Sequence, residues 1–228
     1  MQASRTPIAV FDLDGTSVNG QSGSLISQYL LRHHVVSLPS AARLAWWGIR
    51  YKLRLPHRQG EPREVILRSL NRAQPNAVRE TMHAFHDEVM VPRYYQEALS
   101  EVARRKAEGC VTLLVSATFH EVAERAANYM RVDAFVATEM QQGPDGQYLA
   151  LVAGEVVEGK EKVRAVARWA DEHLGSGSWY IAYAYGDHHS DQQLLCSAHK
   201  AYVVNPSYAL KFSAKRHQWD ILKWGTTL

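Results

Sequence analysis

The chain has 228 residues, 46% of them hydrophobic and 21% charged, so it is long enough to bury an apolar core and too apolar to be disordered. The formal net charge of +3 is too small to argue for nucleic-acid binding. No aliphatic run approaches the roughly 18 to 20 residues that cross a bilayer, and nothing before the first apolar run has the pattern of a secretory signal. Two cysteines, Cys110 and Cys196, cannot build a disulfide framework. We expect a cytoplasmic globule, a monomer or a homodimer, with no nucleic-acid partner.

Four short apolar runs end abruptly in polar or turn residues, which is typical of buried parallel strands. They cover residues 8–11, 111–115, 179–185 and 201–204. Helical patterns accompany them at 93–108, 120–129, 160–174 and 190–198. This alternation predicts an α/β fold, a Rossmann-like doubly wound parallel sheet that binds ligands beyond the carboxyl ends of its strands.

One long segment breaks the alternation, because only helical patterns follow the first strand up to about residue 92. They cover residues 24–34, 41–53, 62–73 and 75–91. The sequence thus predicts an all-helical insertion at 17–92 in a core made of 1–16 and 93–228. A separate stretch, 143–154, contains Pro, Asp and Gly before an apolar run, which suggests a hairpin or flap at the sheet edge.

Two carboxylates, Asp12 and Asp14, follow the first strand with one residue between them. The pleat of a strand points both the same way, toward the crevice where ligands bind. Adjacent carboxylates repel, and Mg²⁺ prefers carboxylate oxygens, so the pair favours a magnesium site. An Asp-rich turn after a strand is the ordinary alternative for such a pair taken alone.

Further polar residues follow the other strands. Asp187 and Asp191 come after the third strand and could converge on the same metal, although they could also cap a helix. Ser116 and Thr118 follow the second strand and suit phosphoryl oxygens or a helix cap equally well. Lys160 and Lys162 begin a helix, where a lysine is usually just solvated.

The order of these residues carries more information than any one of them. Phe11-Asp12-Leu13-Asp14-Gly15-Thr16, then Ser116, then the lysines, then Gly186-Asp187 with Asp191, resembles the four motifs of the haloacid dehalogenase superfamily of phosphohydrolases. The helical insertion is similar to that superfamily's first cap type. The end of the chain resembles the phosphoserine-phosphatase-like subfamily IB.

The resemblance implies a Mg²⁺-dependent phosphatase with a helical cap that closes over a small phosphorylated metabolite. Asp12 would attack phosphorus to form an aspartyl-phosphate, and Asp14 would be the general acid and base. The metal would be held by Asp12, the backbone carbonyl of Asp14, and Asp187, with Asp191 near or behind it.

The phosphoryl oxygens would be bound by Ser116 and one lysine. The register of some phosphoserine phosphatases points to Lys160, whereas the Gly-x-x-Lys-Val pattern of closer IB proteins points to Lys162, which we prefer. The expected substrate contacts also include Gly15, Thr16, Thr118 and Gln21.

The substrate is the least determined feature. Phosphoserine phosphatases are expected to have a glutamate for the substrate ammonium where this chain has Gln21, a neutral amide, so we rank another phosphomonoester above phosphoserine. The aromatic and basic segment 41–55 could instead lie on an anionic lipid surface, as in a lipid-phosphate phosphatase of the phosphatidylglycerophosphatase C type, or simply pack within the cap. A phosphotransferase or mutase on the same scaffold is a further alternative.

Overall fold

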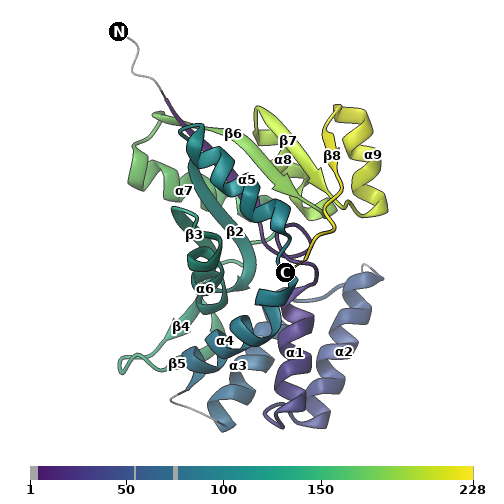
Figure 1. Cartoon of the computed structure of the whole chain (residues 1–228). Coiled ribbons are helices and arrows are strands. Elements are labelled where there is room, and N and C mark those ends of the chain that lie inside the picture. Colours follow the sequence, from purple (N-terminus) through teal and green to yellow (C-terminus); the bar gives the residue numbers. More distant parts are fainter. Residues whose placement is uncertain (1–4, 54, 74–76, 228) are drawn as a thin grey trace.

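The computed structural model describes residues 5–53, 55–73 and 77–227, and its centre is a parallel sheet (Figure 1). The described strands of this sheet are β1 (Thr6–Asp12), β2 (Val111–Phe119), β3 (Ala134–Thr138), β6 (Trp179–Gly186), β7 (Lys200–Val204) and β8 (Asp220–Leu222). They lie in the order β3-β2-β1-β6-β7-β8, and every pairing is parallel. The direction of winding reverses between β1 and β6, which confirms the doubly wound fold, and in such folds ligands bind beyond the strand ends at that point.

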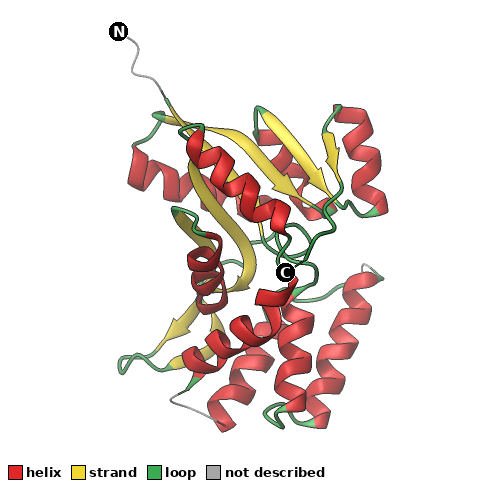
Figure 2. Cartoon of the chain, viewed as in Figure 1, coloured by secondary structure: helices red, strands yellow, loops and turns green. Residues whose placement is uncertain are grey.

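Helices cover both faces of the sheet (Figure 2). Helices α5 (Gln96–Ala107) and α6 (His120–Met130) pack on one face, and α7 (Lys160–Leu174), α8 (Gln192–Ser197) and α9 (Tyr208–His217) pack on the other. The pleat of β1 divides its side chains between them, because Ala9 and Phe11 join the first apolar cluster while Ile8 and Val10 join the second. A strand buried on both faces needs a continuous apolar run, which is why the sequence pattern identified it.

The segment between β1 and β2 is helical in its described part, as expected. It contains α1 (Ser22–Arg32), α2 (Leu38–Lys52), α3 (Glu61–Ala73) and α4 (Val78–Phe85), followed by the π-helical turn η1 (His86–Met90) and the 3-10 turn η2 (Val91–Arg93). The helix expected at 75–91 is thus divided, and Pro75 lies outside the described residues. Pro92 cannot donate the amide hydrogen that a continuing α-helix would need.

Several other elements differ from the sequence-based expectation. The second strand runs on to Phe119, the helix expected at 93–108 starts at Gln96, and the one expected at 190–198 is divided into a 3-10 turn, η3 (His189–Asp191), and α8. The late helix start has a clear reason, since the Tyr95 amide donates to the carbonyl of Ser17 at 3.1 Å and so belongs to an extended segment. Strands β3 and β8 and helix α9 were not expected.

The hairpin expected at 143–154 is present but does not extend the large sheet. Strands β4 (Met140–Gln142) and β5 (Tyr148–Val152) form their own two-stranded antiparallel sheet. The hairpin packs against the helical insertion, where Asn71 Nδ2 of α3 donates to the carbonyl of Tyr148 at 2.7 Å. It therefore connects the core to the insertion instead of lengthening the sheet edge.

The insertion leaves and rejoins the core at neighbouring points. Val18 pairs with both Asp14 and Tyr94, and the Asn19 amide donates to the carbonyl of Arg93 at 2.9 Å. At the exit, the buried ring of His86 bonds Tyr94 Oη at 2.9 Å. In the described part of the chain, no helix has the length and apolar character that crossing a membrane requires.

Candidate active site

Asp12 is the last residue of β1, and its buried carboxylate is the centre of the site. Lys162 Nζ lies 2.6 Å from Asp12 Oδ1, and Thr16 Oγ1 donates to Asp12 Oδ2 at 3.1 Å. The hydroxyl of Ser17 donates to the Asp12 backbone carbonyl at 2.6 Å, which fixes the turn after the strand. The strand end and this turn together hold the carboxylate at the carboxyl end of β1, beside β6.

Two further carboxylates converge on Asp12. Oxygens of Asp12, Asp187 and Asp191 all lie within 4.8 Å of one another, although 179 residues separate the first from the last. Two glycines make this approach possible: a Cβ on Gly186 would lie 2.7 Å from the Cβ of Asp191, and a Cβ on Gly15 would collide with the Asp187 carboxylate. Asp191 also caps its own turn, because its Oδ2 accepts from the His188 amide at 3.1 Å.

The buried ammonium of Lys162 bonds two of these three carboxylates. Its Nζ lies 2.6 Å from both Asp12 Oδ1 and Asp191 Oδ1. Burial alone would lower the pKa of Lys162, but the attraction of Asp12 and Asp191 outweighs it and raises that pKa. The lysine is therefore charged at neutral pH.

The three carboxylates cannot all ionise easily beside a single ammonium. Burial raises the pKa of Asp12 to about 7, against the opposing effect of Lys162. Burial and repulsion from Asp12 and Asp191 raise the pKa of Asp187 to about 8. A divalent cation would offset the repulsion and favour the ionised carboxylates, and the donor set of clustered carboxylate oxygens is the kind that Mg²⁺ prefers. The residues present thus fit a magnesium ion.

The structure separates the two candidate lysines. Both lie in the first turn of α7, which follows Gly159 at a positive φ of 59°. The Lys162 side chain points into the carboxylate cluster and is buried, whereas Lys160 is exposed. Residues two apart on a helix point in widely different directions, so only one of them can face the crevice.

Asp14 lies beside the cluster but bonds the insertion. Its Oδ1 accepts from the Ser22 amide and its Oδ2 from the Ser22 hydroxyl, both at 2.7 Å. The same hydroxyl lies 2.9 Å from Thr118 Oγ1, and the Thr118 amide donates to Ser116 Oγ at 3.1 Å. Burial raises the pKa of Asp14, and the bonds from Ser22 oppose the rise. The ends of β1 and β2 are thereby joined through the first residue of α1.

Arg63 of α3 is a site residue that sequence reasoning missed. Its Nε donates to the carbonyl of Ala117 at 2.7 Å, between Ser116 and Thr118, and its Nη1 donates to the carbonyl of Gln59 at 3.0 Å. Burial lowers the pKa of the guanidinium, and Glu158 and Asp14 oppose this effect. No local pattern indicates the contact, because 54 residues separate Arg63 from Ala117.

The remaining expected contacts fall in different places. Thr16 and Gly15 lie in the cluster, with Thr16 Oγ1 also 3.4 Å from Asp187 Oδ1. Gln21 is exposed at the start of α1, and its side chain makes no cap bond to the helix.

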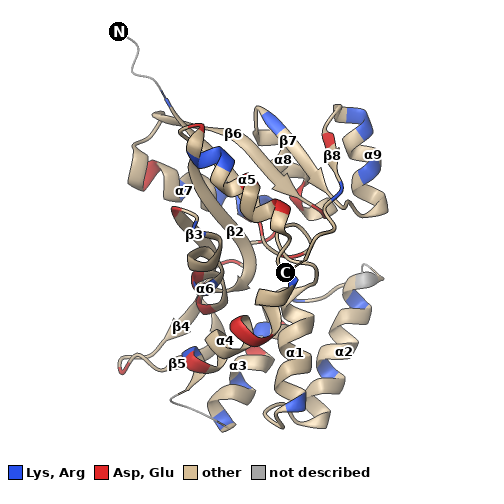
Figure 3. Cartoon of the chain, viewed as in Figure 1, with Lys and Arg blue, Asp and Glu red and all other residues tan. Residues whose placement is uncertain are grey.

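The segment 41–55 lies largely in α2, where Figure 3 shows several basic residues. Arg43 Nε bonds Glu61 at 2.7 Å and Arg50 donates to the carbonyl of Pro56, so both contact partners within the insertion. Trp46 is 57% exposed, which leaves an apolar surface on the helix, and Arg54 lies outside the described residues. Binding to an anionic lipid surface stays a prediction.

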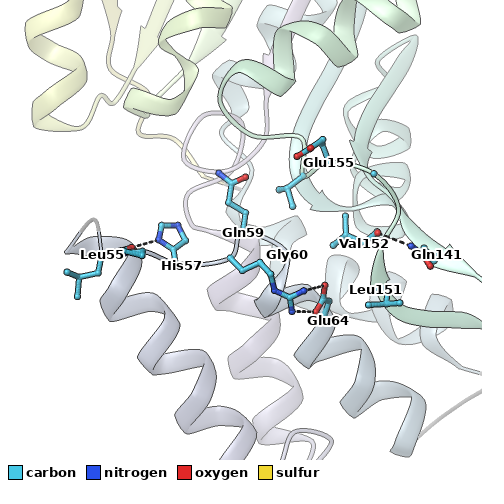
Figure 4. Close-up of a pocket in the computed structure, with 13 residues that line it drawn as sticks. Leu55, His57, Gln59, Gly60, Glu64, Gln141, Leu151, Val152 and Glu155 are labelled. Carbon is cyan, nitrogen blue, oxygen red and sulfur yellow. Dashed lines mark hydrogen bonds and ion pairs between the residues drawn. The ribbon is translucent and has the colours of Figure 1, made fainter.

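A cavity of about 800 Å³ lies where the insertion meets the hairpin. Its walls come from the loop around His57 and Gln59, from Val152 of β5 and from Glu155 (Figure 4). Glu64 is in the wall, but its carboxylate already accepts from Arg58 at 3.1 Å. The cavity therefore adjoins the start of α3, the helix that carries Arg63, and the Glu64 carboxylate in its wall is already paired.

A family comparison agrees with this geometry. The model of the haloacid dehalogenase-like hydrolases matches residues 9–195. With this match, the doubly wound sheet and the carboxylates at its switch point indicate a phosphoric monoester hydrolase. The chain belongs to the haloacid dehalogenase-like hydrolase family, as the resemblance of its motifs implied.

Individual relatives are distant. The chain is 23% identical to a histidinol-phosphatase of Neisseria meningitidis, covering 95% of this chain and 98% of that one. It is 22% identical to a phosphoserine phosphatase of Mycobacterium tuberculosis, covering 95% and 70%. Among solved structures, a Bordetella pertussis protein of unknown function superposes with a TM-score of 0.85 at 26% identity, covering 96% and 98%.

Proposed function

We propose that this phosphatase is Mg²⁺-dependent and works through an aspartyl-phosphate on Asp12. The observation that supports it is the convergence of Asp12, Asp187 and Asp191 around Lys162 at the carboxyl ends of the strands. Mg²⁺ would be held by these carboxylates and the Asp14 carbonyl, and when bound it would offset the repulsion between the nucleophile and an anionic phosphate.

The chain's own groups would carry out the chemistry in two halves. Asp12 attacks phosphorus and expels the alkoxide, which takes a proton from Asp14. Asp14 then takes a proton from the water that cleaves the acyl phosphate and releases inorganic phosphate. Ser116 and the Lys162 ammonium bind the phosphoryl oxygens, where negative charge accumulates.

We propose that the helical insertion, residues 17–92, is a cap over this site. Three contacts support the proposal: Ser22 on Asp14, Arg63 on Ala117, and Tyr51 on Glu158. Each joins an insertion residue to a residue at or beside the reacting groups. A closed cap would exclude bulk water from the aspartyl-phosphate.

The substrate we propose is a small phosphorylated metabolite other than phosphoserine. Gln21 offers a neutral and exposed amide where the resemblance calls for a carboxylate. Histidinol phosphate, which the name of the Neisseria relative specifies, is a second candidate to assay, although its own ammonium would meet the same neutral amide.

The test is phosphate release from p-nitrophenyl phosphate and L-histidinol phosphate, in Mg²⁺ or in EDTA. Asp12→Asn should lower kcat at least about 10³-fold, because no nucleophile remains, and EDTA should abolish wild-type turnover. Asp145→Asn, which changes an exposed aspartate of the hairpin turn, is the matched control. Wild-type turnover by Asp12→Asn would refute the proposal.

A further inference from the structure

Strand β6, which leads into the site, changes its register against β1 partway along. Ile8 pairs with Ile181, whereas the next residue, Ala9, pairs with Tyr183. Strand β6 therefore holds one extra residue, Ala182, at this point. Ala182 and Tyr183 belong to the same apolar cluster, although successive residues of a regular strand face opposite sides of the sheet. This is the pattern of a β-bulge, which re-aims the side chains that follow it.

The register after the bulge decides which residue of β6 lies beside Asp12. In the observed register Phe11 pairs with Tyr185, and Asp187 then follows beside the end of β1. Without the extra residue, Tyr185 would lie opposite Asp12 and its side chain would point to the other face of the sheet. The convergence of Asp187 with Asp12 therefore depends on the shifted register.

A stack of three aromatic rings lies in this shifted register. Tyr185 pairs with Phe11 on one side and with Tyr202 of β7 on the other. Its ring stacks on Phe11 with centroids 4.4 Å apart and planes 2° apart, and on Tyr202 at 4.9 Å and 11°. Cross-strand aromatic pairs of this kind favour one register over the others, because only that register places the rings face to face.

Helix α5, which lies over this face of the sheet, holds the middle ring of the stack by its hydroxyl (Figure 1). Tyr185 Oη donates to Glu101 Oε1 at 2.6 Å and accepts from Arg105 Nε at 2.7 Å. Arg105 is 1% exposed, and its Nη1 donates to Glu108 at 2.7 Å while its Nη2 donates to Tyr202 Oη at 3.2 Å. These bonds fix the ring along the strand direction, in which stacking alone would allow it to slide.

The burial of this charged network is poor evidence for a role in stability. A buried ion pair is often no better than apolar side chains of the same volume, because desolvation of the charges offsets their attraction. Directional hydrogen bonds instead specify one position for the groups that they join. The position specified here is that of Tyr185, which precedes Asp187 by two residues.

We propose that Tyr185 is a positioning residue, whose anchored ring holds the shifted register of β6 that brings Asp187 to Asp12. The inference rests on the proposed Mg²⁺ site and adds a residue that acts through Asp187. Its consequence is that loss of the Tyr185 hydroxyl weakens Mg²⁺ binding, although all three carboxylates are retained.

The test measures Mg²⁺ binding to the metal-free protein by isothermal titration calorimetry. Tyr185→Phe keeps the ring and removes the hydroxyl. Its Mg²⁺ dissociation constant should rise about 10-fold, the lower end of the effect of groups that support metal ligands. The Mg²⁺ concentration for half-maximal hydrolysis of p-nitrophenyl phosphate should rise by the same factor. An unchanged dissociation constant would overturn the inference even if Tm were lower, because a purely structural role predicts that result.

Tyr202→Phe is the matched control, because it removes a hydroxyl bonded to the same arginine from a strand that carries none of the three aspartates. Its Mg²⁺ dissociation constant should equal that of the wild type. An equal rise in both variants would mean a general loosening of the sheet and would overturn the role of Tyr185.

Glu101→Ala tests the anchor on α5. It should weaken Mg²⁺ binding in the wild-type background but have no further effect in Tyr185→Phe, because it acts through the hydroxyl. Additive effects of the two substitutions would mean independent actions and would overturn the anchoring.

Failure of this inference is distinguishable from failure of the proposed function. If the wild-type protein binds no Mg²⁺ and hydrolyses p-nitrophenyl phosphate equally well in EDTA, the proposed function fails and the positioning role fails with it. Mg²⁺-dependent hydrolysis by the wild type, with unchanged affinity in Tyr185→Phe, overturns the positioning role alone. Thermal unfolding in EDTA establishes that each variant is folded.

Discussion

Replacing Lys162 by methionine tests the charge balance of the site directly. Lys162 is 4% exposed, and its Nζ lies 2.6 Å from carboxylates of both Asp12 and Asp191. Removing one partner of a buried ion pair costs about 3 to 5 kcal/mol, because the remaining charge stays buried without compensation. In a chain of this size each kcal/mol lowers Tm by about 2 to 4 °C, so Lys162→Met should lose about 6 to 20 °C in EDTA.

Lys160→Met is the matched control, since Lys160 is an exposed residue of the same helical turn. An exposed substitution changes stability by less than about 0.5 kcal/mol, or about 2 °C here. Turnover should fall about 10²- to 10³-fold for Lys162→Met, the usual effect of losing one electrostatic donor to the transition state, and should be unchanged in the control. Equal Tm and equal turnover for the two variants would refute the reasoning.

The stability loss of Lys162→Met should also depend on pH. In the wild-type protein, burial already raises the pKa of Asp12 to about 7, above the ordinary value of 3.8. A carboxyl whose pKa is raised by folding favours the fold below its ordinary value and loses that contribution as pH rises through the folded value. Without the lysine the pKa of Asp12 should rise further, because Lys162 is the group that opposes the rise. The Tm of Lys162→Met in EDTA should therefore fall further below that of the wild type at pH 8 than at pH 6. A deficit that shrinks with pH would contradict this sign.

Two further predictions concern the turn after β1 and the exit of the insertion. Gly15→Ala should lower Tm by about 2 to 12 °C, because φ is +77° there and a Cβ would meet the Asp187 carboxylate. Displacing that carboxylate should also raise the Mg²⁺ concentration needed for half-maximal turnover. Gly23→Ala is the control, since it lies in α1 with open space around its Cβ and should be neutral or stabilising. Burial lowers the pKa of His86 below its ordinary value of 6.5, so the folded protein favours the neutral imidazole. The stability that the neutral ring contributes is lost as pH falls below about 6.5, because the unfolded chain then binds the proton more readily. The Tm difference between the wild type and His86→Gln should therefore be smaller at pH 5 than at pH 7, and a constant difference in thermal melts would exclude this role.

The parts of the fold that the sequence predicted share a physical cause. β1, β2, β6 and β7 are largely buried, so each needs an apolar run, and the change from apolar to polar residues marks its carboxyl end. β3 and β8 lie at the sheet edges and are partly exposed, so their patterns are weaker. The aspartates were found because they follow strand ends directly.

The residues that the sequence could not indicate act across long distances in the chain. Arg63 and Tyr51 point to the site from α3 and α2, and neither helix differs locally from any amphipathic helix. The choice between Lys160 and Lys162 depends on the rotation of α7 about its axis. That rotation is set by how α7 packs against strands that are distant in the sequence, and the local sequence of the helix does not specify this packing.

The contacts of the insertion explain why its helices affect chemistry that belongs to the core. Ser22 bonds the proposed acid Asp14, Arg63 bonds the carbonyl between Ser116 and Thr118, and Tyr51 bonds Glu158. Each of these contacts joins a different helix of the insertion to a different segment at the carboxyl edge of the sheet: the turn after β1, the end of β2 and the loop before α7. A displacement of the insertion would therefore move the surroundings of the proposed acid Asp14, of the end of β2 and of Glu158 together. Substrate binding that holds the insertion in place would position all three at once, which would couple the placement of the insertion to the proposed chemistry.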